Sequence, residues 1–168
     1  IEAIFAQGNG YLGQRAVLEE VYSTETRGLF LAGTFDRFGK EEVTELPNLA
    51  DFCNIRIFLD DEEFSMVQGK ILLYSRRLNL KDGVITRHVY WEGRSGVEAE
   101  LLFERFVSLA DKHVIASRVR VIPFNRNVKV RIISGINGRV TNGGTQHFHE
   151  VETRIREKRM MEYHTVTG

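Results

Sequence analysis

The sequence contains one cysteine among its 168 residues, so the chain cannot close a disulfide within itself. Nothing in its cysteine usage therefore indicates an oxidising compartment. Cys53 stands between Phe52 and Asn54, close to Ile55, and we expect a buried, inert thiol rather than a nucleophile. No apolar run approaches the roughly 20 residues of a transmembrane helix, and we recognise no signal peptide. We therefore expect a cytoplasmic protein.

An excess of either charge is also missing, because Lys and Arg together number 23 and Asp and Glu together number 23. Nucleic-acid-binding proteins usually carry a basic surplus that neutralises phosphates, and polybasic membrane anchors carry a similar one. We therefore expect neither a nucleic acid nor a membrane as a partner. The hydrophobic share of 42% is ordinary for a globular domain, and the length is sufficient for one domain with its own core.

Apolar residues recur with a period of two through most of the chain, which is the pattern of strands with one buried face. Four runs show it: Ile55–Leu59, Ile85–Trp91, Ala99–Val107 and Ile115–Val121. A fifth run, residues 127–132, places Val128, Val130 and Ile132 on one face. The short polar link from Phe124 to Asn127 predicts that the last two runs form a β-hairpin.

Turn-forming residues separate these runs at intervals of roughly ten residues, which favours an antiparallel β-sandwich or barrel. They are Asp60–Glu63, Lys81–Asp82–Gly83, Asn137–Gly138 and Asn142–Gly143–Gly144. Two segments are ambiguous. Residues 14–22 suit a short helix, and residues 150–162 suit either a helix or a strand that aligns Val151, Thr153 and Ile155. For the second segment we favour the strand. The predicted class is all-β with mostly antiparallel sheets.

The sequence Gly8-Asn9-Gly10-Tyr11-Leu12-Gly13 matches the Gly-x-Gly-x-x-Gly fingerprint of dinucleotide-binding proteins. Residues 4–6, 14–22 and 29–35 could supply a strand, a helix and a strand around it, and Asp36 lies where an acid would bind the ribose. However, the fingerprint needs repeated βαβ units that present a helix N-terminus to the pyrophosphate. After residue 40 the chain shows hairpins instead. We therefore interpret the glycines as a tight turn.

Two further patterns suggest chemistry only weakly. His147 and His149 are two residues apart, so a strand would align their imidazoles as the start of a metal site, with Glu150 or His164 as further ligands. Adjacent acids such as Glu19-Glu20 and Glu41-Glu42 diverge on a strand or turn, so they cannot flank one glycosidic bond. We expect solvated turns at the acids and a polar strand edge at the histidines.

Several blocks of the chain, in order, resemble the N-terminal domain of glycoside hydrolase family 65, the family of maltose, trehalose and kojibiose phosphorylases and acid trehalases. The blocks are IFAQGNGYLGQR at 4–15, AGTFD at 32–36, VTELPNL at 43–49, LNLKDG at 78–83, Arg87, ERFVSLADKH at 104–113 and INGRVTN at 136–142. The resemblance implies a galactose-mutarotase-like supersandwich, which agrees with the period of two. It also implies a single, incomplete domain over residues 1–168. This chain has Gln14-Arg15-Ala16 where members of the family often have Arg followed by Gly. Because of this departure, the resemblance does not assign a single substrate.

In this family the catalytic glutamate and the phosphate site belong to a separate (α/α)6 barrel, so the resemblance assigns no catalytic residue to this chain. It implies packing against that barrel, a homodimer, and an α-glucose disaccharide cleaved by inverting phosphorolysis or hydrolysis. Phosphate would be a co-substrate, and no cofactor is expected. Residues that could face the barrel are Asn9, Tyr11, Arg15, Glu45 and Asn48. A stand-alone carbohydrate-binding module remains an alternative, with Tyr11, Tyr90 and Trp91 as sugar-stacking candidates, and a nucleotide-binding domain is a weaker one.

Overall fold

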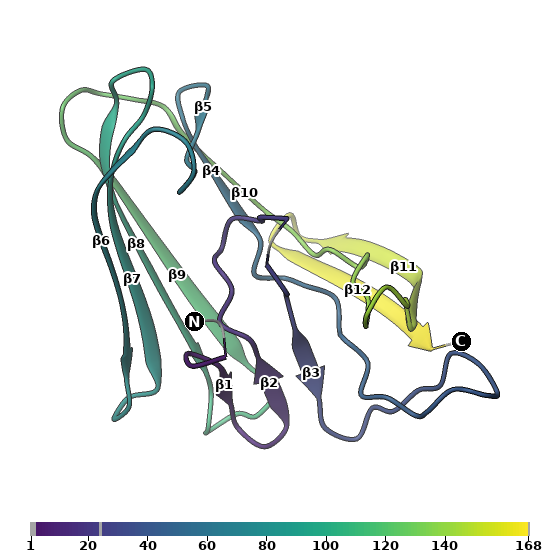
Figure 1. Cartoon of the computed structure of the whole chain (residues 1–168). Coiled ribbons are helices and arrows are strands. Elements are labelled where there is room, and N and C mark those ends of the chain that lie inside the picture. The colour runs from purple at the N-terminus through teal and green to yellow at the C-terminus, as the bar shows by residue number, and fades with distance from the viewer. Residues whose placement is uncertain (1–2, 24, 168) are drawn as a thin grey trace. The chain divides into compact units, whose positions relative to one another are not determined.

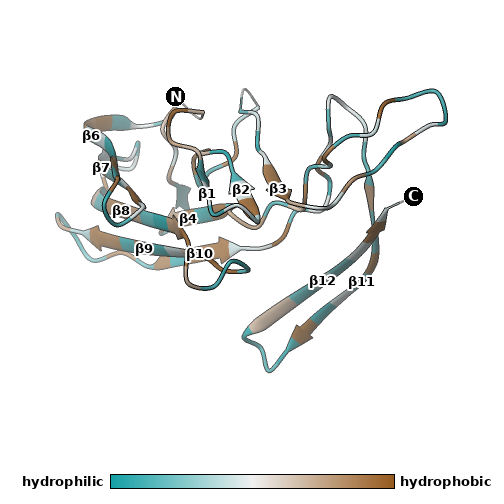
Figure 2. Ribbon diagram, turned by 90° about the horizontal axis from the view of Figure 1, so that it is seen from below, coloured by the Kyte–Doolittle hydropathy of each residue, from teal (hydrophilic) through white to brown (hydrophobic). Residues whose placement is uncertain are grey.

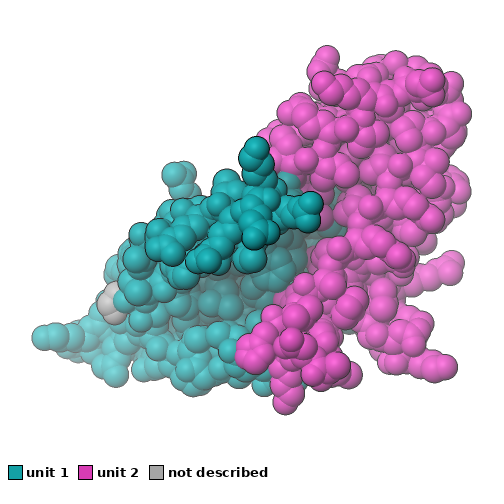
Figure 3. Space-filling view, turned by 180° about the vertical axis from the view of Figure 1, so that it is seen from behind, with its two compact units in different colours: residues 1–54, 134–168 teal, residues 55–133 magenta. Residues whose placement is uncertain are grey.

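The computed structural model describes residues 3–23 and 25–167, which form two compact units (Figure 3). Unit 1 comprises Ile1–Asn54 and Ser134–Gly168, and unit 2 comprises Ile55–Ile133. Twelve strands and no helix occur in the described part of the chain. None of these residues forms a helix that is long and apolar enough to cross a membrane. The all-β prediction is confirmed.

Unit 2 contains a four-stranded antiparallel sheet in the order β6-β7-β8-β9, next to a three-stranded sheet in the order β10-β4-β5 (Figure 1). The strands are β4 (Ile55–Leu59), β5 (Glu62–Glu63), β6 (Lys70–Asn79), β7 (Val84–Glu92), β8 (Glu98–Val107), β9 (Ile115–Pro123) and β10 (Val130–Ser134). Each strand predicted from the alternating runs is present.

The core of unit 2 lies between these two sheets, as expected for a sandwich. Inward positions alternate strictly along β7, where every second residue is buried. The buried cluster joins Val89 and Trp91 of β7 and Leu101 and Phe103 of β8 to Ile57, Leu59 and Phe64. Hydrophobic and hydrophilic residues alternate along β9 (Figure 2). Truncating a buried aromatic side chain to alanine typically lowers the free energy of unfolding by about 3–5 kcal/mol. The cluster therefore contributes strongly to holding the two sheets together.

The predicted hairpin between β9 and β10 is wrong. β9 pairs along its length with β8, from Ala99 opposite Pro123 to Val107 opposite Ile115, whereas β10 lies beside β4. Asp60 explains the change of sheet. Its backbone N–H donates to the carbonyl of Lys129 over 2.8 Å, and its carboxylate accepts the Lys129 N–H over 2.9 Å. This reciprocal pair draws the chain that leaves β9 onto the other layer.

Unit 1 contains a small sheet in the order β1-β2-β3 and a two-stranded hairpin of β11 and β12. The strands are β1 (Gln7–Gly8), β2 (Leu12–Gln14), β3 (Leu29–Leu31), β11 (Phe148–Arg156) and β12 (Met160–Thr167). The strand interpretation of residues 150–162 is confirmed for 150–156 and 160–162, with a bulge between Glu150 and Glu152, whereas residues 157–159 form the turn of the hairpin. Of the other ambiguous segment, residues 15–22 form neither helix nor strand.

The glycine motif forms the hairpin that joins β1 to β2, with Gly8 opposite Gly13. The Asn9 side-chain carbonyl accepts the backbone N–H groups of Tyr11 and Leu12 at 2.9 and 2.8 Å, and Gly10 adopts a φ of 84°. A helix N-terminus that could bind a pyrophosphate does not follow this turn. The interpretation of the motif as a turn between strands is confirmed.

Candidate functional site: a buried histidine between two carboxylates

A buried polar cluster in unit 1 brings together side chains that lie far apart in the sequence. Nδ1 of His147 lies 2.9 Å from Oδ2 of Asp36, and Nε2 of His147 lies 3.1 Å from Oε2 of Glu45. The His147 side chain is 2% exposed, whereas that of Glu45 is 43% exposed. We call Asp36, Glu45, Asn142 and His147 the His147 cluster. It joins the segment that follows β3 to the residue that precedes β11.

The geometry of this cluster favours a protonated imidazole. A carboxylate accepts hydrogen bonds and an imidazole donates from both nitrogens only as the cation, so two flanking carboxylates select the charged ring. The hydrogen bond to Asp36 raises the pKa of His147 above its ordinary value of 6.5, against burial, and Glu45 adds to the rise. The same bond lowers the pKa of Asp36 below 3.8. A cationic histidine between two acids is a structural ion triad.

Asn142 and Asn48 extend this cluster into β3. The Asn142 amide donates to Oε2 of Glu45 over 3.1 Å and to the carbonyl of Leu46 over 3.0 Å, and its carbonyl oxygen accepts the Asn48 N–H over 2.7 Å. The Asn48 side chain accepts the N–H of Leu29 over 2.9 Å. It also donates to the carbonyl of Arg27 over 3.0 Å. The buried Asn48 amide and the half-buried Asn142 amide are therefore both engaged at both ends, which fixes these segments together.

A cavity of about 330 Å³ adjoins Asn48 in unit 1. Its lining residues are Arg15, Thr26, Arg27, Phe30, Asn48, Thr141, Asn142 and Gly143. Arg27 is held by Asp51 at 2.6 Å and by Glu25 at 3.3 Å, so much of its charge is already compensated. The wall therefore combines polar side chains, whose donors mostly bond within the protein, with the aromatic ring of Phe30.

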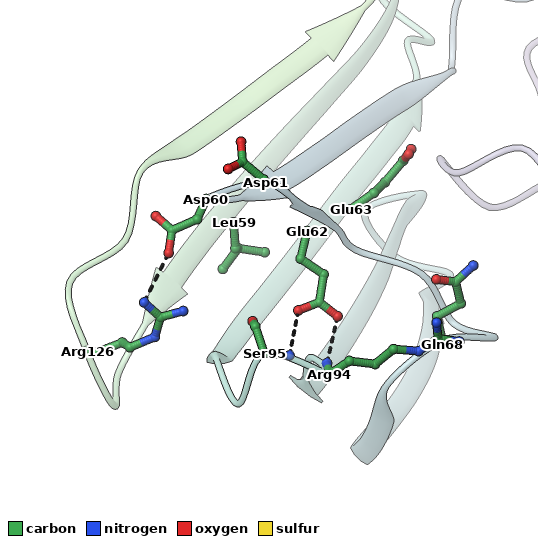
Figure 4. Close-up of a pocket in the computed structure, with 9 residues that line it drawn as sticks. All are labelled: Leu59, Asp60, Asp61, Glu62, Glu63, Gln68, Arg94, Ser95 and Arg126. Atoms are coloured by element: carbon green, nitrogen blue, oxygen red, sulfur yellow. Dashed lines mark hydrogen bonds and ion pairs between the residues drawn. The ribbon is translucent and has the colours of Figure 1, made fainter.

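A second, more acidic cavity of about 690 Å³ lies in unit 2 around the turn between β4 and β5 (Figure 4). The Glu62 carboxylate accepts the backbone N–H groups of Arg94 and Ser95 at 2.6 and 2.9 Å. Burial pushes the pKa of Glu62 up, but the hydrogen bonds from Ser95 and Arg94 prevail and lower it. Asp60 pairs with Arg126 at 3.1 Å. These carboxylates brace turns, and in the described part of the chain no group of three or more His, Cys, Asp or Glu side chains is placed to hold a metal ion.

The predicted site residues separate into two places. Glu45 and Asn48 belong to the network just described. Asn9 and Tyr11 lie in the β1–β2 hairpin, where Asn9 shapes the turn. Arg15 follows β2 and donates from Nε to the carbonyl of Thr26 over 3.0 Å. That these five residues face a catalytic domain stays a prediction.

His147 and His149, which the sequence offered only as weak metal candidates, have different surroundings in the structure. His147 lies one residue before β11, and both of its ring nitrogens face carboxylates, so neither is available to a metal ion. His149 is exposed and stands opposite Val166, while Glu150 stands opposite Thr165 and His164 opposite Glu152. Sequence reasoning missed Asn142, which appeared only as part of a turn signal. Its role depends on partners some 95 residues away, and no local pattern reveals them.

Comparison with known proteins agrees with this architecture. The model of the glycosyl hydrolase family 65 N-terminal domain matches residues 1–168. A kojibiose phosphorylase of Halothermothrix orenii is 51% identical over 154 residues, which are 92% of this chain and 20% of that protein. An alpha,alpha-trehalose phosphorylase of Thermoanaerobacter brockii is 37% identical over 156 residues, which are 84% of this chain and 20% of that protein.

A kojibiose phosphorylase of Escherichia coli is 36% identical over 160 residues, covering 95% of this chain and 21% of that protein. A solved structure provisionally named a kojibiose phosphorylase, from the human microbiome, has a TM-score of 0.84 at 20% identity and covers 92% of this chain and 22% of that one. The chain thus spans about a fifth of the relatives that it matches. On the family match, the chain belongs to glycosyl hydrolase family 65 and corresponds to its N-terminal domain.

Proposed function

We propose that this chain is the non-catalytic N-terminal domain of a disaccharide phosphorylase, or hydrolase, that cleaves α-linked glucose disaccharides with inversion. The observation that carries the proposal is the family match over residues 1–168, together with relatives named kojibiose and trehalose phosphorylases. Because the chain corresponds to about a fifth of those relatives, the chemistry belongs to the remainder of the parent protein.

In the parent, a carboxylic acid would protonate the glycosidic oxygen, and phosphate, or water in a hydrolase, would attack the opposite face of the sugar. Phosphate is then a co-substrate, and no cofactor is required. We place the parent in the cytoplasm as a homodimer. The domain described here would pack against the catalytic (α/α)6 domain and border the entrance to its active site.

The polar network of unit 1 supports a scaffolding role rather than a catalytic one. Both nitrogens of His147 are held by carboxylates, and the Asn142 and Asn48 amides are engaged at both ends. A catalytic acid or base must exchange its proton with a substrate within hydrogen-bond reach. The His147 imidazole is almost fully enclosed, so it braces the fold.

The test compares the 168-residue chain with the full-length parent. Each is incubated with phosphate and kojibiose, trehalose or maltose, and glucose 1-phosphate is measured enzymatically. We expect product from the parent with one disaccharide and none from the chain alone. Glucose 1-phosphate released by the chain alone would show that it carries its own catalytic residues. Free glucose without glucose 1-phosphate from the parent would indicate hydrolysis.

A carbohydrate-binding module is the second candidate, and the cavity beside Asn48 favours it because Phe30 lies among polar side chains there. However, one of the three aromatic residues that the sequence suggested for sugar stacking is not accessible. Trp91 is fully buried in the unit 2 core and cannot stack on a sugar. Calorimetry with glucose and the three disaccharides discriminates between the candidates. Heat of binding at millimolar ligand that disappears in Phe30→Ala would favour the module.

A further inference from the structure

The segment between Asp36 and Glu45 forms a loop with an unusual apolar surface. It is closed by an antiparallel bridge between these two residues and leaves the three-stranded sheet after β3 (Figure 1). We call residues 35–45 the apolar loop. Phe35 is 66% exposed, Phe38 is 63% exposed and Val43 is 77% exposed. Exposed loop tips usually carry small or polar residues, so three large apolar side chains within nine positions require an explanation.

Leu80, at the β6–β7 turn, is an example of one exposed apolar residue among polar ones: it is 87% exposed and stands between Asn79 and Lys81. Single apolar residues at a surface are ordinary. In the apolar loop, by contrast, Phe38 and Val43 each stand two residues inside the bridge. The two residues therefore occupy equivalent positions on the two sides of the loop.

The base of the apolar loop is fixed from two directions. The bridge exchanges both backbone hydrogen bonds between Asp36 and Glu45, at 3.1 and 2.8 Å. The Asp36 and Glu45 carboxylates are held in turn by His147, and Asn142 adds a bond to Glu45. At the tip, the Glu42 N–H donates to the carbonyl of Gly39 over 3.1 Å. A loop that is ordered before binding loses less conformational entropy on association, which strengthens docking.

We infer that the apolar loop docks into an apolar surface of the parent polypeptide beyond residue 168, with Phe38 and Val43 as its anchors. The length of the relatives identifies the polypeptide that would cover the loop. They are about five times longer than this chain, so a parent of similar length would carry the adjoining polypeptide in the same chain. A tethered partner has a high effective concentration, so even a small patch of this kind would be occupied. The inference rests on the proposed function for the existence of that polypeptide.

Photocrosslinking in the full-length parent tests the inference. Phe38 is replaced by p-benzoyl-L-phenylalanine, which keeps an aromatic ring at the position, and the irradiated protein is digested for mass spectrometry. We expect a crosslinked peptide from the same chain beyond residue 168. The control places the same amino acid at Leu80, an exposed apolar site on a turn of unit 2, where we expect no such product. Val43, replaced in the same way, gives an independent second position.

Each result decides the question. A product that migrates as a covalent dimer would show that the loop contacts a second copy, and would overturn the inference. A crosslink confined to residues 1–168, or none at either Phe38 or Val43, would overturn it as well. Glucose 1-phosphate formation by the unlabelled parent is measured separately. An inactive parent that still crosslinks as expected would reject the proposed function and leave the docking intact.

Discussion

His147 and Asp36, which are 111 residues apart in the chain, meet with 2.9 Å between Nδ1 and Oδ2. The contact ties the entry to β11 to the loop that follows β3. A second carboxylate, that of Glu45, occupies the other side of the ring at 3.1 Å. Because the cluster draws on two distant parts of unit 1, its ionisation is expected to govern how firmly those parts hold together.

The first prediction concerns pH. A group whose pKa is higher in the folded than in the unfolded protein stabilises the fold. The full contribution is present at pH values below the unfolded-state pKa, and it is lost as the pH rises through the folded-state pKa. His147 is such a group, and its ordinary pKa is 6.5. The pKa of Asp36 is lowered, so Asp36 stabilises the fold at pH values above its ordinary pKa of 3.8. This contribution is lost as the pH falls through the lowered pKa. The triad should therefore contribute most between pH 3.8 and pH 6.5.

The measurement is thermal unfolding of the wild type and of His147→Gln across this range. The neighbouring charges are those of Asp36, Glu45 and His149, which also acts on Asp36. We expect the variant to unfold at a lower temperature, with a difference that is largest in this window and shrinks as the pH rises above it. A difference that does not depend on pH would contradict an ionic role for the imidazole.

The second prediction concerns Asn48, whose side chain bonds to the Leu29 N–H and to the Arg27 carbonyl. Asn48→Ala removes these partners and leaves buried backbone groups unsatisfied, which typically costs about 1–3 kcal/mol for each such group. We expect a loss of unfolding free energy in this range in urea titrations. Asn127→Ala, at an exposed position, is the matched control and should change stability by less than about 0.5 kcal/mol. Equal effects would refute the bracing role.

The third prediction uses two glycines with the same backbone conformation. Gly69 and Gly96 both have a φ of 76°, but a Cβ at Gly96 would meet nothing within 4 Å. A Cβ at Gly69 would collide with the carbonyl oxygen of Glu92 and with Nε1 of Trp91. Gly96→Ala should therefore cost about 1–2 kcal/mol, the usual penalty of a left-handed conformation, and Gly69→Ala distinctly more. The difference between the two variants isolates the steric term, and its absence would show that the turn relaxes.

Local patterns were sufficient for β4, β7, β8, β9 and most turns, but not for the ten-residue β6. The alternation along β7 predicted its buried face because one side of that strand packs on the core. Arg87 breaks the rule, since it occupies an inward position at 2% exposure, where its guanidinium carbon lies 3.9 Å from the centroid of the Phe103 ring. An aromatic face can receive a cation. A single strand cannot reveal that its neighbour will supply such a ring.

Pairings between distant segments were beyond local reasoning. The run ending at Val121 and the run beginning at Asn127 are adjacent in sequence, yet β9 and β10 join different sheets because Asp60 binds Lys129. The His147 cluster was missed for the same reason, since Asp36 was considered only as a ribose-binding acid and Glu45 only as a residue that could face the barrel. The family resemblance supplied the architecture, but neither it nor the periodicity located this ion triad.

The fourth prediction returns to the turn that resembles a nucleotide-binding motif. The Asn9 side chain accepts two backbone N–H groups, from Tyr11 and Leu12, and thereby closes the hairpin between β1 and β2. Asn9→Asp replaces the amide oxygen with a carboxylate oxygen, which is also an acceptor, and should be tolerated. Asn9→Ala removes the acceptor and should cost about 0.5–2 kcal/mol, as at other sites where a short polar side chain caps free N–H groups.

Chemical denaturation of both variants measures this difference, and amide hydrogen exchange at Tyr11 and Leu12 localises it. We expect faster exchange at these two amides in Asn9→Ala and near-native protection in Asn9→Asp. If both variants behaved alike, the turn would depend on Gly10, whose φ of 84° only glycine adopts without strain, and not on the asparagine acceptor. The two outcomes distinguish a side-chain cap from a purely backbone-determined turn.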